Sequence, residues 1–153
     1  MIFRDKINLS GELPSVSFIV PCYNEAAIIE SKIKNCSELD YPAEKLEIIF
    51  ITDGPTDGSD ALVSKHNNIK LMHQSMRRGK STAENRSVKE AKREIIIFSD
   101  ANTILQKNAV REIVKYYAYE KVGAVSGEKR ILQDEKEMQP ERVKVCIGNM
   151  NRY

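Results

Sequence analysis

A run of four apolar residues, Ile95 to Phe98, is followed at once by the polar stretch Ser-Asp-Ala-Asn-Thr. The run is rich in β-branched residues, which predicts a strand buried on both faces, as in a parallel sheet. Its carboxyl end would present Asp100 and Asn102 at the edge where open α/β sheets bind ligands. Two oxygen donors one residue apart can reach the same hard cation, although Ser, Asp and Asn also favour turns and helix caps. We therefore expect a site for a metal ion and an anionic substrate, with a structural turn as the alternative.

Other apolar runs occur along the chain, and segments with helical periodicity separate them. We predict strands over residues 16–20, 46–52, 69–72, 94–98 and 122–126, and helices around residues 28–36, 59–65, 81–92 and 109–117. This alternation indicates an α/β fold with a mostly parallel central sheet, helices on both faces and right-handed crossovers. The third strand is less apolar than the others, so we place it nearer an edge of the sheet.

Four residues are expected to mark where these elements begin or end. Pro21 should end the first strand, because proline cannot donate to a sheet ladder. Asn24 is placed to cap the helix that follows. Ser81 and Glu84 have the spacing of a capping box, which predicts a helix start there.

A chain of 153 residues is long enough for one domain with a sizeable core. We expect a loose N-terminal arm over residues 1–15, interrupted by Gly and Pro, and a folded core over residues 16–127. Beyond this core the sequence becomes dense in charge, so residues 128–153 form a separate region, with a helix expected over residues 141–149. No internal repeat, low-complexity tract or linker supports a second domain.

The composition excludes several classes of function. The 24 Lys and Arg against 22 Asp and Glu leave a formal charge of +2, too small for a general nucleic-acid binder. Three cysteines form no metal-type pair, which indicates a reducing compartment, and two histidines leave few candidates for a zinc centre or a serine-type triad. The chain has no signal segment and no apolar run near the ~20 residues of a membrane span, so we expect a cytoplasmic location.

The loops after the first four predicted strands carry an aromatic ring, carboxylates, an amide and cations. Because parallel strands end at the same edge, these side chains should line one crevice. The basic stretch Arg77-Arg78-Gly79-Lys80 lies at a helix start, where orphan backbone N–H groups and the helix dipole favour an anion. The parts match a nucleoside diphosphate with its cation. They are Tyr23 with Glu25, Asp53, Lys80, and Asp100 with Asn102.

Two familiar nucleotide motifs do not fit, and each site residue also has a structural reading. Gly79-Lys80-Ser81 matches the end of a P-loop, but Gln74 stands where its first glycine belongs. No Gly-x-Gly-x-x-Gly follows the first strand, which argues against an ordinary dinucleotide fold. As structural alternatives, Tyr23 would fill the core, Asp53 would form a turn, and the basic stretch would be a solvated face.

Four stretches, in this order and spacing, resemble successive motifs of the family 2 glycosyltransferases. They are Val20-Pro21-Cys22-Tyr23-Asn24-Glu25, the loop from Asp53 to Gly58, Gly79-Lys80 followed by Ala83 and Asn85, and Asp100-Ala101-Asn102. The resemblance covers residues 15–127 and implies the GT-A fold. It identifies residues 16–127 as a nucleotide-sugar-binding core and residues 128–153 as the incomplete start of an acceptor-side region.

The resemblance also implies a role for each candidate residue. Tyr23, or the backbone beside it, would pack against the base, and Asp53 would hydrogen-bond the base. Pro21 and Glu25 would also belong to the nucleotide site. Lys80 would sit near the diphosphate. Asp100 would bind Mn²⁺ or Mg²⁺ together with Asn102, and UDP is the expected nucleotide because it is the commonest in the family.

The sequence departs from the family pattern at two positions. Asn102 stands where the metal motif has a second aspartate, which keeps an oxygen ligand but removes a charge. Thr52 replaces the first of two aspartates that usually follow the second strand. Family members also continue into an acceptor-binding half, so we expect a fragment whose general base lies beyond Tyr153, and we interpret Glu128 as a surface charge.

The implied activity is transfer of a sugar from a nucleotide-sugar donor to a hydroxyl of a glycan or lipid-linked acceptor, with inversion. In the full-length protein this part would lie in the cytoplasm or at the inner face of the membrane, through segments outside this chain. The alternatives are a catalytically incomplete module that binds nucleoside diphosphates and a flavodoxin-like signalling domain.

Overall fold

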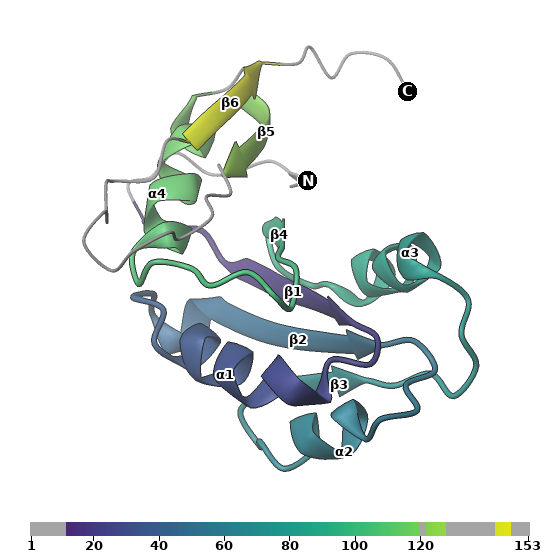
Figure 1. Ribbon diagram of the computed structural model, residues 1–153. Helices are drawn as coiled ribbons and strands as arrows, with labels where there is room; N and C mark the ends of the chain where they lie inside the picture. Colours follow the sequence, from purple (N-terminus) through teal and green to yellow (C-terminus); the bar gives the residue numbers. More distant parts are fainter. Residues whose placement is uncertain (1–11, 120–121, 128–142, 148–153) are drawn as a thin grey trace.

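The computed structural model describes residues 12–119, 122–127 and 143–147, and Figure 1 shows how their elements are arranged. Four parallel strands form the central sheet in the order β3-β2-β1-β4. The strands are β1 (Val16–Cys22), β2 (Leu46–Thr52), β3 (Lys70–Met72) and β4 (Ile95–Phe98). The helices are α1 (Ala26–Ser37), α2 (Ser59–Val63), α3 (Lys80–Glu90) and α4 (Ala109–Lys115), with short 3-10 turns η1 (Ala43–Lys45) and η2 (Tyr116–Ala118). The predicted α/β class and parallel sheet are confirmed, and β3 lies at an edge as expected.

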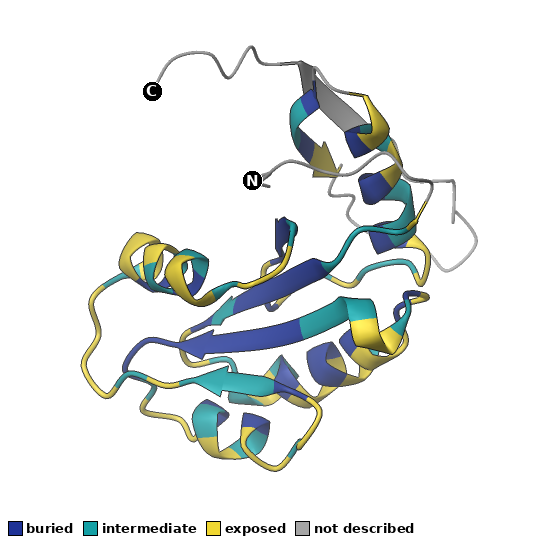
Figure 2. Ribbon diagram, turned by 180° about the vertical axis from the view of Figure 1, so that it is seen from behind, coloured by how far each residue is buried: buried dark blue, intermediate teal, exposed yellow. Residues whose placement is uncertain are grey.

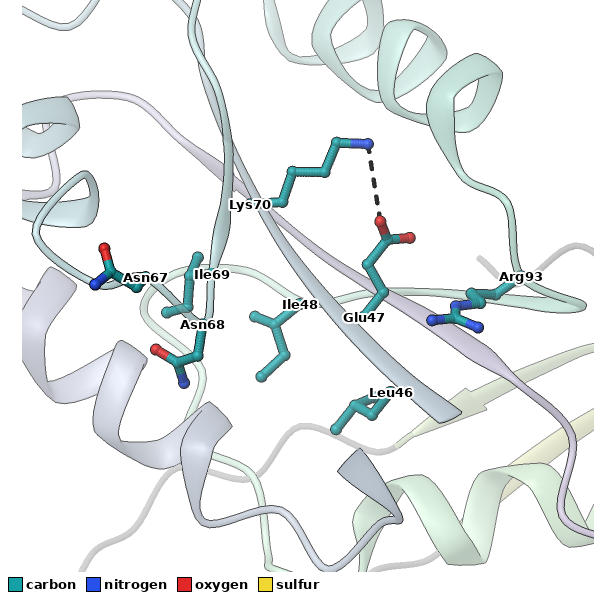
Figure 3. A pocket seen from close by; sticks show the side chains of 8 residues that line it. All are labelled: Leu46, Glu47, Ile48, Asn67, Asn68, Ile69, Lys70 and Arg93. Atoms are coloured by element: carbon teal, nitrogen blue, oxygen red, sulfur yellow. Dashed lines mark ion pairs between the residues drawn. The ribbon is translucent and has the colours of Figure 1, made fainter. Parts of the chain in front are cut away.

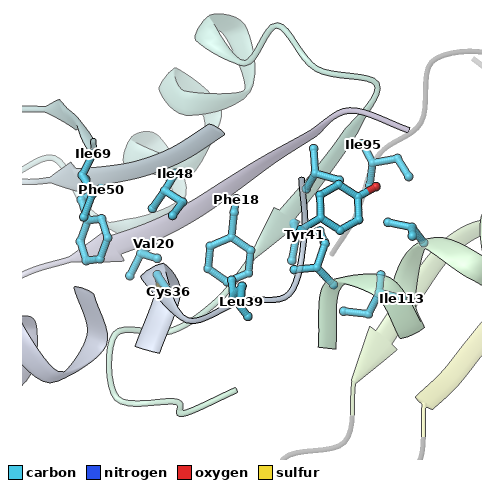
Figure 4. Packing of buried hydrophobic residues seen from close by; sticks show 14 of the residues in the cluster. Phe18, Val20, Cys36, Leu39, Tyr41, Ile48, Phe50, Ile69, Ile95 and Ile113 are labelled. Atoms are coloured by element: carbon cyan, nitrogen blue, oxygen red, sulfur yellow. The ribbon is translucent and has the colours of Figure 1, made fainter. Parts of the chain in front are cut away.

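Alternate residues of the central strands face opposite sides of the sheet, so each side buries its own apolar cluster. On one side Val16, Phe18 and Val20 of β1 pack with residues of α1, α2 and α4, in the cluster of Figure 4. On the other side Ile19 and Ile49 pack with residues of α3. Figure 2 shows the buried strands between helices whose outer faces are exposed. This burial on both faces explains why the strands lack a polar side.

Pro21 does not end the first strand, contrary to the prediction. β1 continues past it, and Pro21 lies opposite Ile51 of β2. The carbonyl of Ile19 accepts the N–H of Ser99, so the backbone of Ile19, and of Pro21 two residues further, faces the β4 side. β4 pairs with β1 only as far as Ile19, so in the described part of the chain no strand there requires the N–H that proline lacks.

Both predicted helix caps are wrong. Asn24 has a positive φ of 53°, and its side chain exchanges hydrogen bonds with Thr56 instead of capping α1. The capping box of Ser81 and Glu84 does not form, because α3 already begins at Lys80. Both residues therefore lie inside the helix. A local sequence signal was outweighed by contacts between loops.

The chain after η2 also differs from the prediction. The run over residues 122–126 is a strand, β5 (Val122–Gly127), but it pairs antiparallel with β6 (Val143–Ile147) in a separate two-stranded sheet. The helix predicted over residues 141–149 is therefore wrong where β6 lies. Its sequence Val-Lys-Val-Cys-Ile alternates with a period of two, which suits a strand.

Some predictions concern residues outside the described ranges: most of the N-terminal arm over residues 1–15, Glu128, and all of residues 128–153 except β6. Among the helices within those ranges, none has both the length and the apolar character that crossing a membrane requires.

The loops after β1 and β2 are joined by hydrogen bonds around Asp57. One carboxylate oxygen accepts the N–H of Ala26 at 2.8 Å, and the other accepts the N–H of Ser59 at 3.0 Å and the Ser59 hydroxyl. The N–H of Glu25 donates to the same hydroxyl at 3.2 Å. Burial alone would raise the pKa of Asp57, but these hydrogen bonds outweigh burial and hold the pKa below its usual range. Asp57 thus supplies the cap for the start of α1.

We predict that Asp57→Ala lowers the free energy of unfolding near neutral pH by about 1 kcal/mol, as loss of a helix cap does. Folding depresses the pKa of this carboxyl, so its contribution is present above the ordinary value of 3.8 and is lost as the pH falls through the folded-state value. Urea denaturation near neutral pH and at about pH 2.5 measures both effects. Glu44→Ala, which removes an exposed carboxylate in η1, is the control. An equal loss at both pH values would contradict the assignment.

Candidate functional site

The carboxyl ends of the parallel strands lie at one edge of the sheet, and the predicted site residues follow them. The register pairs Cys22 with Thr52, so Tyr23 and Asp53 leave β1 and β2 at the same level. Asp100 follows β4, the neighbour of β1 on its other side. The topology therefore brings three of the predicted loops to one place.

Asp53 joins the end of β2 to the basic loop before α3. Its side chain is buried, with 6% of the residue exposed. The carboxylate accepts the N–H of Arg78 at 2.9 and 3.1 Å and the N–H of Gly79 at 2.6 Å. Such charge-assisted bonds are roughly twice as strong as neutral ones. Asp53 therefore fixes the start of α3 and the cations beside it.

Gly54 allows the basic loop to run directly against the end of β2. Its φ is +63°, and its N–H donates to the carbonyl of Gln74 at 2.7 Å. The N–H of Gln74 donates in turn to the carbonyl of Thr52 at 3.1 Å. A Cβ at Gly54 would lie 2.5 Å from the backbone nitrogen of Arg77. The close approach of two backbones explains why glycine stands here.

Tyr23 contacts the basic loop through its ring. The guanidinium carbon of Arg77 lies 3.9 Å from the centre of the ring, a cation–π contact. Tyr23 remains 37% exposed, so it is not core filling. An exposed aromatic face next to a cation suits a planar base.

Lys80 and Asp100 meet at the same edge. The ammonium of Lys80 donates to Asp100 at 2.6 Å and lies 4.0 Å from the carboxylate of Glu84. The hydrogen bond that Lys80 donates to Asp100 raises the pKa of Lys80, with a smaller opposing effect of burial. Asn102 is exposed beyond the buried Ala101, so both predicted metal ligands lie on the surface of one turn.

Pro21 and Glu25 lie at the same end of β1 as Tyr23. Pro21 is half-buried within the strand, and Glu25 occupies the position before α1. The hydrogen bond that ties Glu25 to the neighbouring loop comes from its backbone N–H. Their proximity to the site follows from the fold, and their predicted roles stay predictions.

The oxygen ligands around Asp100 meet only part of what Mn²⁺ or Mg²⁺ needs. Among the described residues no group of three His, Cys, Asp or Glu side chains could hold a metal. Asp100 and Asn102 offer one carboxylate and one amide, fewer than the six oxygens that Mg²⁺ requires. Sites of this kind take the remaining oxygens from substrate phosphates and water. The residues therefore fit a metal that binds with a diphosphate, and they do not form a metal cage.

Thr52, one of the two departures from the family pattern, faces a histidine. It is fully buried, and its hydroxyl lies 3.0 Å from Nδ1 of His73, the first residue after β3. The same nitrogen lies 3.5 Å from the carboxylate of Asp60 in α2. The replacement for the family's aspartate therefore connects the ends of β2 and β3.

Sequence reasoning missed two residues that shape this edge. Arg86 of α3 donates to the side chain of Gln74 and, at 3.3 Å each, to the carbonyls of Thr52 and Met72. Lys32 of α1 is fully buried behind the turn of Asp100. The signal for Arg86 was that the last carbonyls of parallel strands need hydrogen-bond donors, which a basic residue can supply. The sequence alone could not distinguish Arg86 from the exposed cations of the same helix.

A hollow of about 330 Å³ lies elsewhere, at the amino ends of β2 and β3 (Figure 3). Two of its lining residues, Lys70 and Glu47, form an ion pair at 3.8 Å. It is lined by Leu46, Glu47, Ile48, Asn67, Asn68, Ile69, Lys70 and Arg93. Because it lies at the opposite end of the strands, it is distinct from the edge that gathers the predicted residues.

A family model described as Glycosyl transferase family 2 matches residues 17–149. The poly-beta-1,6-N-acetyl-D-glucosamine synthase of Staphylococcus aureus (strain COL) is 35% identical over 124 residues, which are 78% of this chain and 30% of that protein. The enzyme of the same name from Staphylococcus epidermidis is 30% identical over the same length. The chain thus spans about 30% of these relatives.

Solved structures share the fold. The mannosyltransferase PcManGT from Pyrobaculum calidifontis, in complex with GDP-Man and Mn²⁺, has a TM-score of 0.72 and 35% identity, covering 78% of this chain and 36% of that one. Residues 1–349 of Staphylococcus aureus TarS give a TM-score of 0.62 at 24% identity, covering 67% and 32%. These similarities confirm the expected GT-A fold.

Gly54 and Gly58 provide a matched pair of substitutions. Both have positive φ, of +63° and +82°, but only a Cβ at Gly54 meets another atom within 4 Å. We predict that each change to alanine costs about 1–2 kcal/mol of backbone strain. Gly54→Ala should cost about 1–3 kcal/mol more, as overpacking does. Urea denaturation measures the difference, and equal losses would show that the contact with Arg77 has no effect.

Proposed function

Because the chain belongs to glycosyl transferase family 2, we propose that it is the donor-binding part of a hexosyltransferase. The proposed reaction moves a sugar from a nucleoside diphosphate, with UDP as the favoured nucleotide, to a hydroxyl acceptor. The observation that supports it best is the meeting of three contacts at one edge. They are Arg77 on Tyr23, Asp53 with Gly79, and Lys80 with Asp100.

Tyr23 and Asp53 are the proposed contacts of the base, and Pro21 is proposed to line the nucleotide site. The exposed ring of Tyr23 offers a face on which a base can stack. The carboxylate of Asp53 already accepts N–H groups from Arg78 and Gly79. A carboxylate has about four acceptor positions, so it retains room for an N–H of the base. Glu25 is placed beside the nucleotide.

Lys80 and the start of α3 are the proposed contacts of the diphosphate. The helix begins at Lys80 and has 11 residues, so its dipole adds to the charge of the ammonium. Asp100 and Asn102 would hold Mn²⁺ or Mg²⁺ together with phosphate oxygens. When bound, such an ion offsets the negative charge that develops on the leaving diphosphate. Lys80 would then exchange its bond to Asp100 for one to phosphate.

The acceptor side is proposed to lie outside this chain. The general base would belong to residues beyond Tyr153, and transfer would invert the sugar by direct displacement. The acceptor would be a glycan or a lipid-linked hydroxyl. The proposed setting is the cytoplasm, with any attachment to the inner face of the membrane supplied by other segments.

Asn102 favours a second candidate function, because loss of one carboxylate weakens a metal site. In that case the chain would be a module that binds nucleoside diphosphates without turnover. A form of the protein extended beyond Tyr153 distinguishes the two. Hydrolysis or transfer of a UDP-sugar by the extended form supports the enzyme, and nucleotide binding without turnover supports the module.

We predict that UDP binds more tightly with Mn²⁺ than with EDTA, and that Lys80→Met weakens binding in Mn²⁺ about five- to tenfold. An exposed cation contributes on the order of 1 kcal/mol, which sets this range. Isothermal titration calorimetry with UDP and GDP measures both effects. Lys89→Met, an exposed lysine in the last turn of α3, is the control. Equal affinity with and without Mn²⁺ would contradict the metal assignment.

A further inference from the structure

Lys32 is a lysine without solvent exposure, which is rare among lysines unless the ammonium is paired. It lies on the face of α1 that packs against the sheet, with Ile29, Ile33 and Cys36. Its ammonium lies 5.8 Å from the centre of the Phe18 ring. Burial of an ammonium is costly unless hydrogen bonds satisfy it. The partners of Lys32 therefore show what the residue is for.

Both hydrogen bonds of Lys32 go to the turn after β4. The ammonium donates to the hydroxyl of Ser99 at 2.8 Å and to the carbonyl of Thr103 at 2.6 Å. These two acceptors bracket Asp100 and Asn102. The N–H of Thr103 also donates to the carbonyl of Asp100 at 3.2 Å, which closes the turn. Lys32 thus fixes both ends of the segment that carries the candidate metal ligands.

A second residue of α1 holds the same loop further along. The amide of Asn35 donates to the carbonyl of Leu105 at 2.8 Å and accepts its N–H at 2.9 Å. This clamp lies beyond Thr103, outside the turn that Lys32 contacts. The two attachments separate anchoring of the loop in general from control of the turn.

The charge around Lys32 favours a role toward the turn. Burial lowers the pKa of its ammonium, while Cys36, Cys22 and Asp100 act in the opposite direction. Burial also raises the pKa of Cys22 to about 12 and that of Cys36 to about 11, so both thiols are neutral at physiological pH. Among these groups, the carboxylate of Asp100 is the one that carries a charge to balance the ammonium.

We propose that Lys32 is a positioning residue for the donor complex, because it sets the spacing of Asp100 and Asn102 from behind the turn. The inference rests on the proposed function of this edge. Without the ammonium, the Ser99 hydroxyl and the Thr103 carbonyl lose their donor and the turn relaxes. The contacts of Tyr23 and Asp53 lie on other loops, so nucleotide binding without metal does not depend on Lys32.

The test compares Lys32→Met with Asn35→Leu. Titration calorimetry gives the dissociation constant of UDP in Mn²⁺ and in EDTA for each variant, and circular dichroism checks the fold. Loss of a residue that orients metal ligands typically weakens metal binding about 10- to 100-fold. Lys32→Met should therefore lose most of the gain in affinity from Mn²⁺ and keep its affinity in EDTA within about twofold. Asn35→Leu should keep the full gain.

A merely structural role would lower the affinity for UDP equally in Mn²⁺ and in EDTA, or in neither. The ratio of the UDP dissociation constant in EDTA to that in Mn²⁺ therefore identifies a positioning role. A ratio in Lys32→Met equal to that of the unaltered protein overturns the inference alone. A ratio of one in the unaltered protein overturns the proposed metal site as well. Ser99→Ala removes one of the two acceptors without a change of charge, and it decides the matter if Lys32→Met does not fold. Its ratio should fall in part, and a full ratio would again overturn the inference.

Discussion

The carboxylate of Asp53 accepts the backbone N–H groups of Arg78 and Gly79, and the arrangement of the candidate site depends on this contact. It joins the end of β2 to the start of α3, and Asp53 lies 25 residues before Arg78 and 26 before Gly79 in the sequence. Because the acceptors are buried and the donors are backbone groups, the position of the loop does not depend on flexible side chains. The loop can therefore hold Arg77 over Tyr23 while α3 directs Lys80 to Asp100.

The fold was largely predictable, because burial on both faces of a parallel sheet leaves a strong signal in the sequence. β2 begins and ends as predicted. The order of strands and helices follows from the alternation of apolar runs with segments whose apolar residues recur at helical spacing. The errors arose where an element's end depends on a neighbour. Pro21 is accommodated because β4 is short, and Asn24 is released from capping because Asp57 caps α1 from another loop. Such relations join distant residues, so no local pattern can contain them.

The site was predictable in its location, although not in its pairings. Sequence analysis predicted that carboxylates and cations meet at one edge and that Asp53 binds a ligand. In the structure Asp53 accepts three hydrogen bonds from backbone N–H groups of the protein. Lys32 was missed for a different reason. It stands beside Ile33 on the apolar face of α1, and a lysine there can extend its ammonium to solvent or bury it on a partner. Only the acceptors on the turn after β4 decide between these outcomes.

The contact between Lys80 and Asp100 also supports the proposed role of a cation in donor binding. Lys80 already pairs with Asp100, so binding of a diphosphate to Lys80 would exchange one partner for another. A diphosphate that drew Lys80 away would leave Asp100 next to added negative charge, which costs free energy. A divalent ion shared between Asp100 and the phosphates removes that cost, and the buried ammonium of Lys32 balances the same carboxylate from behind. Because Asn102 contributes an oxygen and no charge, this balance rests on Asp100 alone among the two proposed ligands.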